Sequence, residues 1–157
     1  MPDPSPKVAN PGFIRPPQVY LVAVLIGLGL QVFWPLRLPG GATIALVGTL
    51  LIAAAVITFG LTVRAFAAAS TPVPGNQPAT ALVRSGPLRF SRNPIYLSFT
   101  VFQLGLGLLL HNAWILLMLI FPVVLMDLVV IPREEHFMEM KFGADYADYK
   151  AKVRRWI

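Results

Sequence analysis

Four long apolar stretches constrain the fold of this chain more than any other feature of its sequence. They cover residues 18–36, 42–66, 94–110 and 113–131, and few polar side chains interrupt them. An α-helix needs about 17–25 predominantly apolar residues to cross a bilayer, so all four are long enough, the third only just. The sequence therefore predicts an all-α polytopic membrane protein with four transmembrane helices.

Composition agrees with a membrane protein. Hydrophobic residues make up 56% and charged residues 13% of the 157 residues, whereas soluble domains contain about 25% charged residues. The mean hydropathy is +0.68. Absence of cysteine excludes disulfides, thiolate metal sites and a cysteine nucleophile. The net charge of +6 points to loops that face anionic lipid. We therefore expect membrane lipids, but no nucleic acid, among its partners.

Length predicts a single integral membrane domain over residues 1–157. Residues 1–16 contain five prolines and none of the regions of a signal peptide, so we expect a flexible cytoplasmic tail. Residues 67–93 form a long connection rich in proline and glycine, and such connections are usually functional or disordered. No metal site is expected, because His111 and His136 belong to opposite sides of the membrane.

Basic residues give the orientation of the four helices. With four crossings, the tail, the 67–93 loop and the C-terminus share one side, and only Arg37 belongs to the other. The shared side carries Lys7, Arg15, Arg64, Arg84, Arg89, Arg92, Arg133, Lys141, Lys150, Lys152, Arg154 and Arg155. Because cytoplasmic loops are enriched in lysine and arginine, both termini and the loop are expected in the cytoplasm.

After the fourth stretch, residues 132–141 continue the helix out of the membrane until Phe142-Gly143 breaks it. Four apolar or aromatic residues then recur at spacings of three and four, which places them on one helix face; they are Tyr146, Tyr149, Val153 and Trp156. Basic residues cover the other faces. This pattern predicts an amphipathic C-terminal helix at the membrane interface.

The polar stretch from Arg84 to Tyr96 lies between apolar runs and carries three arginines. Asn93-Pro94 predicts a helix start, because asparagine is a good N-cap and proline is favoured at the first helical position. The free N–H groups and partial positive charge of a helix N-terminus can hold polar ligand groups. The alternative is a basic loop that touches lipid headgroups.

The short turn at His111-Asn112 makes the third and fourth helices an antiparallel hairpin, so the Arg84–Tyr96 stretch lies beside Glu134-Glu135. A carboxylate pair next to an arginine-rich helix start suits a ligand that carries both signs of charge. The alternative is that the two glutamates only pair with neighbouring arginines (Arg89, Arg92 or Arg133). For Asp127, inside the fourth helix, structural pairing and ligand contact both remain open.

Two further patterns concern helix packing. Gly27-Leu28-Gly29 and Gly105-Leu106-Gly107 lie inside apolar helices, where close packing explains them better than a nucleotide loop does. Pro122 predicts a kink in the fourth helix.

Several motifs in order resemble the membrane methyltransferases, which include isoprenylcysteine carboxyl methyltransferases and phospholipid N-methyltransferases. They are Leu82-Val83-x-x-Gly86-Pro87-x-Arg89-x-x-Arg92-Asn93-Pro94-x-Tyr96, then Glu134-Glu135, then Phe142-Gly143-x-x-Tyr146-x-x-Tyr149. The likeness covers about residues 64–157 and includes Thr71 and Pro74. The family often has histidine at the position of Asn93 and glycine at that of Ser98.

This resemblance implies S-adenosylmethionine as cofactor, bound by residues 82–157, and a lipophilic or lipidated acceptor that arrives from the bilayer. The cofactor contacts it implies are Leu82, Val83, Arg92, Asn93, Pro94, Tyr96, Glu134 and Glu135. Glu134, Glu135 and Arg133 are the implied catalytic residues, with Arg133 at the acceptor. No proton transfer is assigned to Asn93, because its amide does not titrate.

The expected reaction is direct displacement of a methyl group from sulfur, which mainly requires alignment of donor and acceptor. A carboxylate acceptor needs no base, whereas an amine acceptor must lose a proton, which Glu134 or Glu135 can take. The sequence leaves the acceptor and the oligomeric state open. Two other functions also remain: an NADPH-dependent sterol-type reductase and a non-catalytic membrane binding or assembly module.

Overall fold

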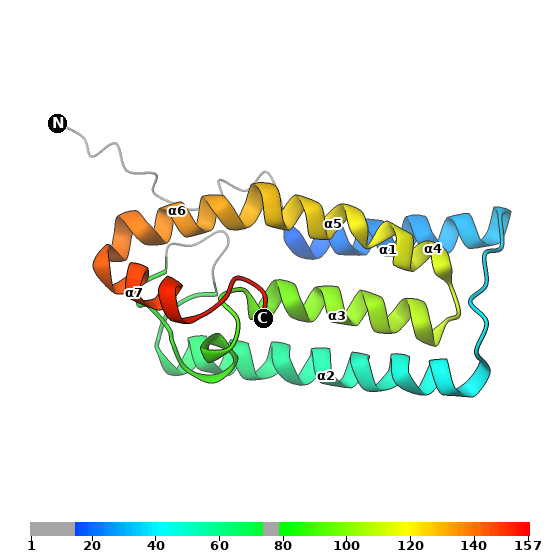
Figure 1. Cartoon of the computed structure of the whole chain (residues 1–157), viewed down its shortest axis with the longest axis horizontal. Coiled ribbons are helices and arrows are strands. Elements are labelled where there is room, and N and C mark those ends of the chain that lie inside the picture. The colour runs from blue at the N-terminus through cyan, green and yellow to red at the C-terminus, as the bar shows by residue number, and fades with distance from the viewer. Residues whose placement is uncertain (1–14, 74–78) are drawn as a thin grey trace.

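The computed structural model describes residues 15–73 and 79–157, and in this part of the chain all regular structure is helical apart from one isolated bridge between Arg37 and Asn112. The chain is an all-α polytopic membrane protein, as predicted (Figure 1). Most of the predicted N-terminal tail, and Pro74 in the loop, lie outside the described residues.

The helices follow the predicted stretches closely. α1 spans Pro16–Phe33, α2 spans Gly41–Ala68 and α3 spans Pro94–Leu109, and a short 3-10 helix, η1, covers Gly86–Arg89. A nearly continuous rod follows, made of α4 (Ala113–Met118), α5 (Ile120–Leu125), a π-helical segment η2 (Met126–Val130) and α6 (Ile131–Phe142); α7 (Ala144–Lys152) ends the helical part.

Among the described residues, α1, α2 and the Ala113–Phe142 rod are long and apolar enough to cross a membrane. The third predicted crossing, α3, has 16 residues. At about 1.5 Å per residue it extends about 24 Å, slightly less than the hydrocarbon core of roughly 30 Å. This helix is therefore slightly shorter than the lower limit of about 17 residues, and its crossing of the membrane stays a prediction.

α3 runs beside α2 along its own length in Figure 1, and the two helices make the most extensive contact in the bundle. Glycines permit this approach: a Cβ on Gly105 would lie 2.7 Å from the carbonyl oxygen of Gly48. A Cβ on Gly27 would similarly lie 2.9 Å from the backbone of Ile115. The close-packing prediction is confirmed for Gly27, Gly105 and Gly107, whereas Gly29 has open space around it.

Prolines explain the irregularities of the rod. It is interrupted at Leu119, three residues before Pro122, where the sequence predicts a kink. In the π-helical segment, Ile131 donates its N–H to the carbonyl of Met126, five residues earlier. Pro132 has no N–H for the carbonyl four residues before it, so a local change from the α-helical pattern costs fewer hydrogen bonds there.

The C-terminal segment differs from its prediction. α7 ends at Lys152, Val153 is extended (φ −121°, ψ 130°), and Trp156 packs into the core cluster that contains Tyr20 and Tyr96. The predicted helix face therefore stops at Tyr149, and its extension through Val153 and Trp156 is wrong. Tertiary contacts override the periodicity, because the partly buried Trp156 packs against this core cluster and donates to Asp127 instead of continuing α7.

Candidate functional site

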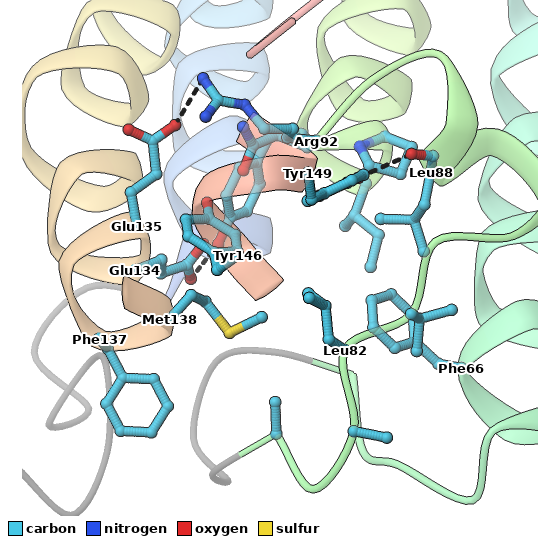
Figure 2. Close-up of a pocket in the computed structure, with 17 residues that line it drawn as sticks. Phe66, Leu82, Leu88, Arg92, Glu134, Glu135, Phe137, Met138, Tyr146 and Tyr149 are labelled. Atoms are coloured by element: carbon cyan, nitrogen blue, oxygen red, sulfur yellow. Dashed lines mark hydrogen bonds and ion pairs between the residues drawn. The ribbon is translucent and has the colours of Figure 1, made fainter. Parts of the chain in front are cut away.

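A cavity of about 90 Å³ lies where the start of α3, α6, α7 and the segment before η1 meet. Figure 2 shows the glutamates of α6 on one side and Phe66 and Leu82 on the other, with Tyr146 between them. All eight residues predicted to contact a cofactor line this cavity: Leu82, Val83, Arg92, Asn93, Pro94, Tyr96, Glu134 and Glu135. The hairpin of α3 with the rod thus brings together two polar clusters that are distant in the sequence.

α3 begins at Pro94 as predicted, but Asn93 does not cap it with its side chain. Instead, Asn93 Nδ2 donates to the carbonyl of Arg155 at 3.0 Å, and the backbone N–H of Asn93 donates to Ser91 Oγ at 3.1 Å. The asparagine therefore ties the helix start to the C-terminal segment.

Arg92 and Glu135 form a buried ion pair, with Nη2 and Oε1 3.0 Å apart and side chains only 9% and 7% exposed. Part of the alternative reading, that the glutamates pair with arginines, is thus correct for Glu135. The pairing of Arg92 is incomplete, however. Its Nε and Nη1 are buried and have no hydrogen-bond partner in residues 15–73 and 79–157. A buried donor without an acceptor is costly, so this guanidinium is well suited to an additional anion.

Glu134 has a different environment from its neighbour. Its Oε1 accepts a hydrogen bond of 2.6 Å from the hydroxyl of Tyr96, and both residues are buried. No cationic side chain of the described residues forms an ion pair with Glu134. A buried carboxylate is stabilised by a cation more than by a neutral donor alone, so Glu134 offers a place for a positive group of a ligand.

α7 contributes Tyr146 and Tyr149 to the lining of the cavity. Gly143, with φ +50°, forms the break between α6 and α7 in a conformation that favours glycine. The hydroxyl of Tyr149 donates to the carbonyl of Leu88 at 2.7 Å and so fixes α7 to η1 (Figure 2). Burial raises the pKa of both Tyr146 and Tyr149 to about 12, which keeps these phenols protonated at neutral pH.

Other candidates lie elsewhere. Arg133 is exposed on α6 and does not line the cavity, so it is separate from the other predicted site residues. Arg89 is exposed as well. Asp127 pairs with Arg155 at 3.1 Å and accepts from Trp156 Nε1 at 3.0 Å, which favours the structural reading of this residue.

One residue of this polar network, Arg155, was not predicted from the sequence. Arg155 forms an ion pair of 2.8 Å with Glu135, although the periodicity placed it on the solvent face of an interfacial helix. No local signal reveals this contact, because it depends on the chain reversal after Lys152. The apolar lining from Phe66, Leu88, Phe137 and Met138 also emerges only from the fold.

Comparison with known proteins gives the family. The profile of the phospholipid methyltransferase family matches residues 43–145, which include Leu82–Tyr96 and the two glutamates. An uncharacterized protein of Haemophilus influenzae is 40% identical over 63 residues, which are 40% of this chain and 100% of that protein. No solved structure matches significantly. The reductase alternative is not favoured, and the chain belongs to the phospholipid methyltransferase family.

Proposed function

We propose that this protein transfers a methyl group from S-adenosylmethionine to a lipid or lipidated acceptor at the cytoplasmic face of the membrane. One observation carries the proposal: a single cavity holds buried groups of both charges whose pairing within the described residues is incomplete. They are Nε and Nη1 of Arg92 and the carboxylate of Glu134. A ligand with a carboxylate and positive groups satisfies both.

The residues present fit S-adenosylmethionine. Its methionine carboxylate suits Arg92 and the N-terminus of α3, where the helix dipole is positive. Its ammonium and sulfonium groups suit Glu134, with Glu135 nearby but already paired with Arg92. The apolar side chains that complete the lining, such as Leu82 and Phe66, suit the adenine ring.

The cavity is too small to admit the cofactor without a change in its shape. Its volume of about 90 Å³ is below the roughly 300–1,000 Å³ typical of sites for molecules of this size. The cofactor therefore needs the cavity to widen on binding. α7 is tied to η1 by the bond from Tyr149 to Leu88, and to the segment before η1 by the exposed Arg84, which contacts the carbonyl and carboxylate of Asp145. Because these ties are few, we expect α7 to move.

A second cavity supports a lipophilic acceptor. It has a volume of about 340 Å³, lies between α1, α2 and α3, and is lined mainly by apolar side chains such as Val56, Phe59 and Phe102. Tyr20 lines this cavity and Tyr96 lines the first one, and both belong to one packed cluster. The two cavities thus share a wall, and an acyl or isoprenoid chain in the second brings its polar end close to the first.

When bound, S-adenosylmethionine supplies a methyl group on a positively charged sulfur atom. Arg92 and the start of α3 orient its carboxylate end, and the enclosed cavity aligns donor with acceptor. Glu134, hydrogen-bonded to Tyr96 at the shared wall, takes the proton from an amine acceptor. A carboxylate acceptor needs no such step. The excess of basic residues at this end of the bundle supports a cytoplasmic site.

Ligand-dependent stability tests this function. Protein purified in detergent should unfold at a higher temperature with S-adenosylmethionine or S-adenosylhomocysteine than without, because a ligand selective for the native state stabilises it. NADPH is the matched negative ligand. Labelled S-adenosylmethionine added to native membranes that contain the protein should then place its label in the lipid fraction or in lipidated protein. Stabilisation by NADPH alone, or no transfer of label, would contradict the proposal.

A further inference from the structure

The last residues of the chain form a strap beside the candidate site, against the start of α3. From residue 153 the chain returns from α7 to the start of α3, where the N–H of Arg92 donates to the carbonyl of Arg154 at 3.0 Å. Asn93 Nδ2 holds the next carbonyl, that of Arg155, also at 3.0 Å. Trp156 anchors the end of the strap through Asp127 and the core cluster. The strap thus connects the start of α3 with the rod.

All three guanidinium nitrogens of Arg155 donate hydrogen bonds to carboxylates. Its Nη2 lies 2.8 Å from Oε2 of Glu135 and its Nε lies 3.3 Å from Oε1 of the same carboxylate. Its Nη1 donates to Asp127 Oδ1 at 3.1 Å. Both oxygens of Glu135 are therefore already occupied by one arginine in the two-pronged geometry that guanidinium and carboxylate prefer.

This occupation has a consequence for Arg92. It reaches Glu135 through Nη2 alone, at 3.0 Å from Oε1, and its Nε and Nη1 keep no partner within the described residues. If Arg155 did not hold both oxygens, Glu135 would be able to turn and pair with Arg92 through two bonds. Such a pair would consume the donors that the proposed function gives to the ligand's carboxylate.

We propose that Arg155 is a positioning residue, which holds Glu135 so that Arg92 keeps two donors for the carboxylate of the bound methionine moiety. The inference rests on the proposed function, because it assigns that carboxylate to Arg92. It predicts an effect confined to ligands that carry the carboxylate. A residue that merely supported the fold would affect the binding of every ligand of the cavity.

The test compares two ligands on the full-length protein in detergent. S-adenosylhomocysteine carries the amino-acid end, and 5′-methylthioadenosine is a related nucleoside thioether without it. Arg155→Met should weaken S-adenosylhomocysteine binding about 10- to 100-fold, the range expected for lost hydrogen bonds to a charged group. The affinity for 5′-methylthioadenosine should not change. Arg154→Met is the matched control, because Arg154 is exposed and contributes only its backbone carbonyl.

Arg155→Lys keeps a cation beside Glu135 and Asp127 and serves if the methionine variant does not fold. Lysine cannot hold both oxygens in a fixed fork, so this variant should lose part of the affinity for S-adenosylhomocysteine and none for 5′-methylthioadenosine. Equal losses for both ligands, or no loss in either variant, would overturn the role of Arg155. Failure of the unmodified protein to bind S-adenosylhomocysteine would instead overturn the proposed function.

Discussion

The two cavities differ in the forces that they offer to a ligand. The smaller one, about 90 Å³, contains Arg92, Glu134 and Glu135, all largely buried. The larger one, about 340 Å³, contains almost only apolar side chains, with Ser98, Gln103 and Tyr20 as its polar members. Charged hydrogen bonds are directional and fix both the chemistry and the orientation of a ligand. Apolar burial is non-directional and depends mainly on area.

The two cavities should therefore differ in how strictly they select their ligands. A site with charges of both signs leaves few choices of ligand, whereas an apolar site accepts any chain that fills it. The motifs by which the sequence resembles the membrane methyltransferases are concentrated around the charged cavity. The apolar cavity is built by ordinary hydrophobic positions of three helices, which carry no comparable motif. The sequence is therefore more informative about the proposed cofactor than about the acceptor.

The largest effect is expected in the charged cavity. Arg92→Met removes the donors proposed for the ligand's carboxylate and should weaken S-adenosylhomocysteine binding at least about 100-fold, because hydrogen bonds to charged groups are worth about 1.5–3 kcal/mol each. Calorimetric titration measures this change. Arg89→Met is the control, since Arg89 is exposed and lies outside the lining. Equal affinity of the two variants for S-adenosylhomocysteine would mean that the ligand's carboxylate does not bind to Arg92 in the charged cavity.

Tyr96 and Tyr20 lie on the two sides of the wall between the cavities, and removing their hydroxyls should lower the free energy of unfolding by different amounts. Tyr96→Phe leaves the buried Glu134 without its donor, and we expect a loss of about 1–3 kcal/mol in the free energy of unfolding. Tyr20→Phe removes only a bond of 2.8 Å to Thr100, a neutral partner, and should cost about 1 kcal/mol or less. Denaturation in detergent compares them. A larger loss for Tyr20→Phe would show that Glu134 does not depend on Tyr96.

Filling the apolar cavity should affect the acceptor alone. Val56→Trp adds bulk at its edge and should raise the concentration of lipid extract needed for half-maximal methyl transfer by about tenfold, with unchanged affinity for S-adenosylhomocysteine. Ile57→Trp makes the same change one residue later, at a position of similar exposure outside the lining. If both variants behave alike, the acceptor chain does not occupy this cavity.

The smallest effect is expected at Gln103. Its Nε2 donates to the carbonyl of Ile115 at 3.1 Å, but its buried Oε1 has no partner in the described part of the chain. Gln103→Met loses one hydrogen bond and also removes the unpaired acceptor, so its unfolding free energy should change by less than about 1 kcal/mol. Asn112→Leu removes an amide with both ends paired and should cost about 2 kcal/mol or more, as thermal unfolding would reveal. Similar losses would mean that Gln103 is better paired than its contacts indicate.

Much of the fold follows from local sequence. Long apolar runs with few or no charges form the long helices, and Pro94 and Gly143 mark a helix start and a helix break. The proximity of the Arg84–Tyr96 stretch to the two glutamates also follows, because the short turn at Asn112 forces the two helices to run antiparallel. In each case the deciding interaction lies within a few residues or depends on a simple topological constraint.

The sequence by itself determined the membrane class, the family motifs and the polar residues that line the charged cavity. Only the tertiary structure decided how the charges pair. Glu134 and Glu135 are adjacent, yet they point about 100° apart around α6 and meet Tyr96 and Arg92 respectively. Arg155 pairs with Glu135 because the chain turns back after α7 ends, whereas the periodicity predicted that the helix continues. Such pairings depend on ångström-scale distances between segments remote in sequence, which no local pattern records.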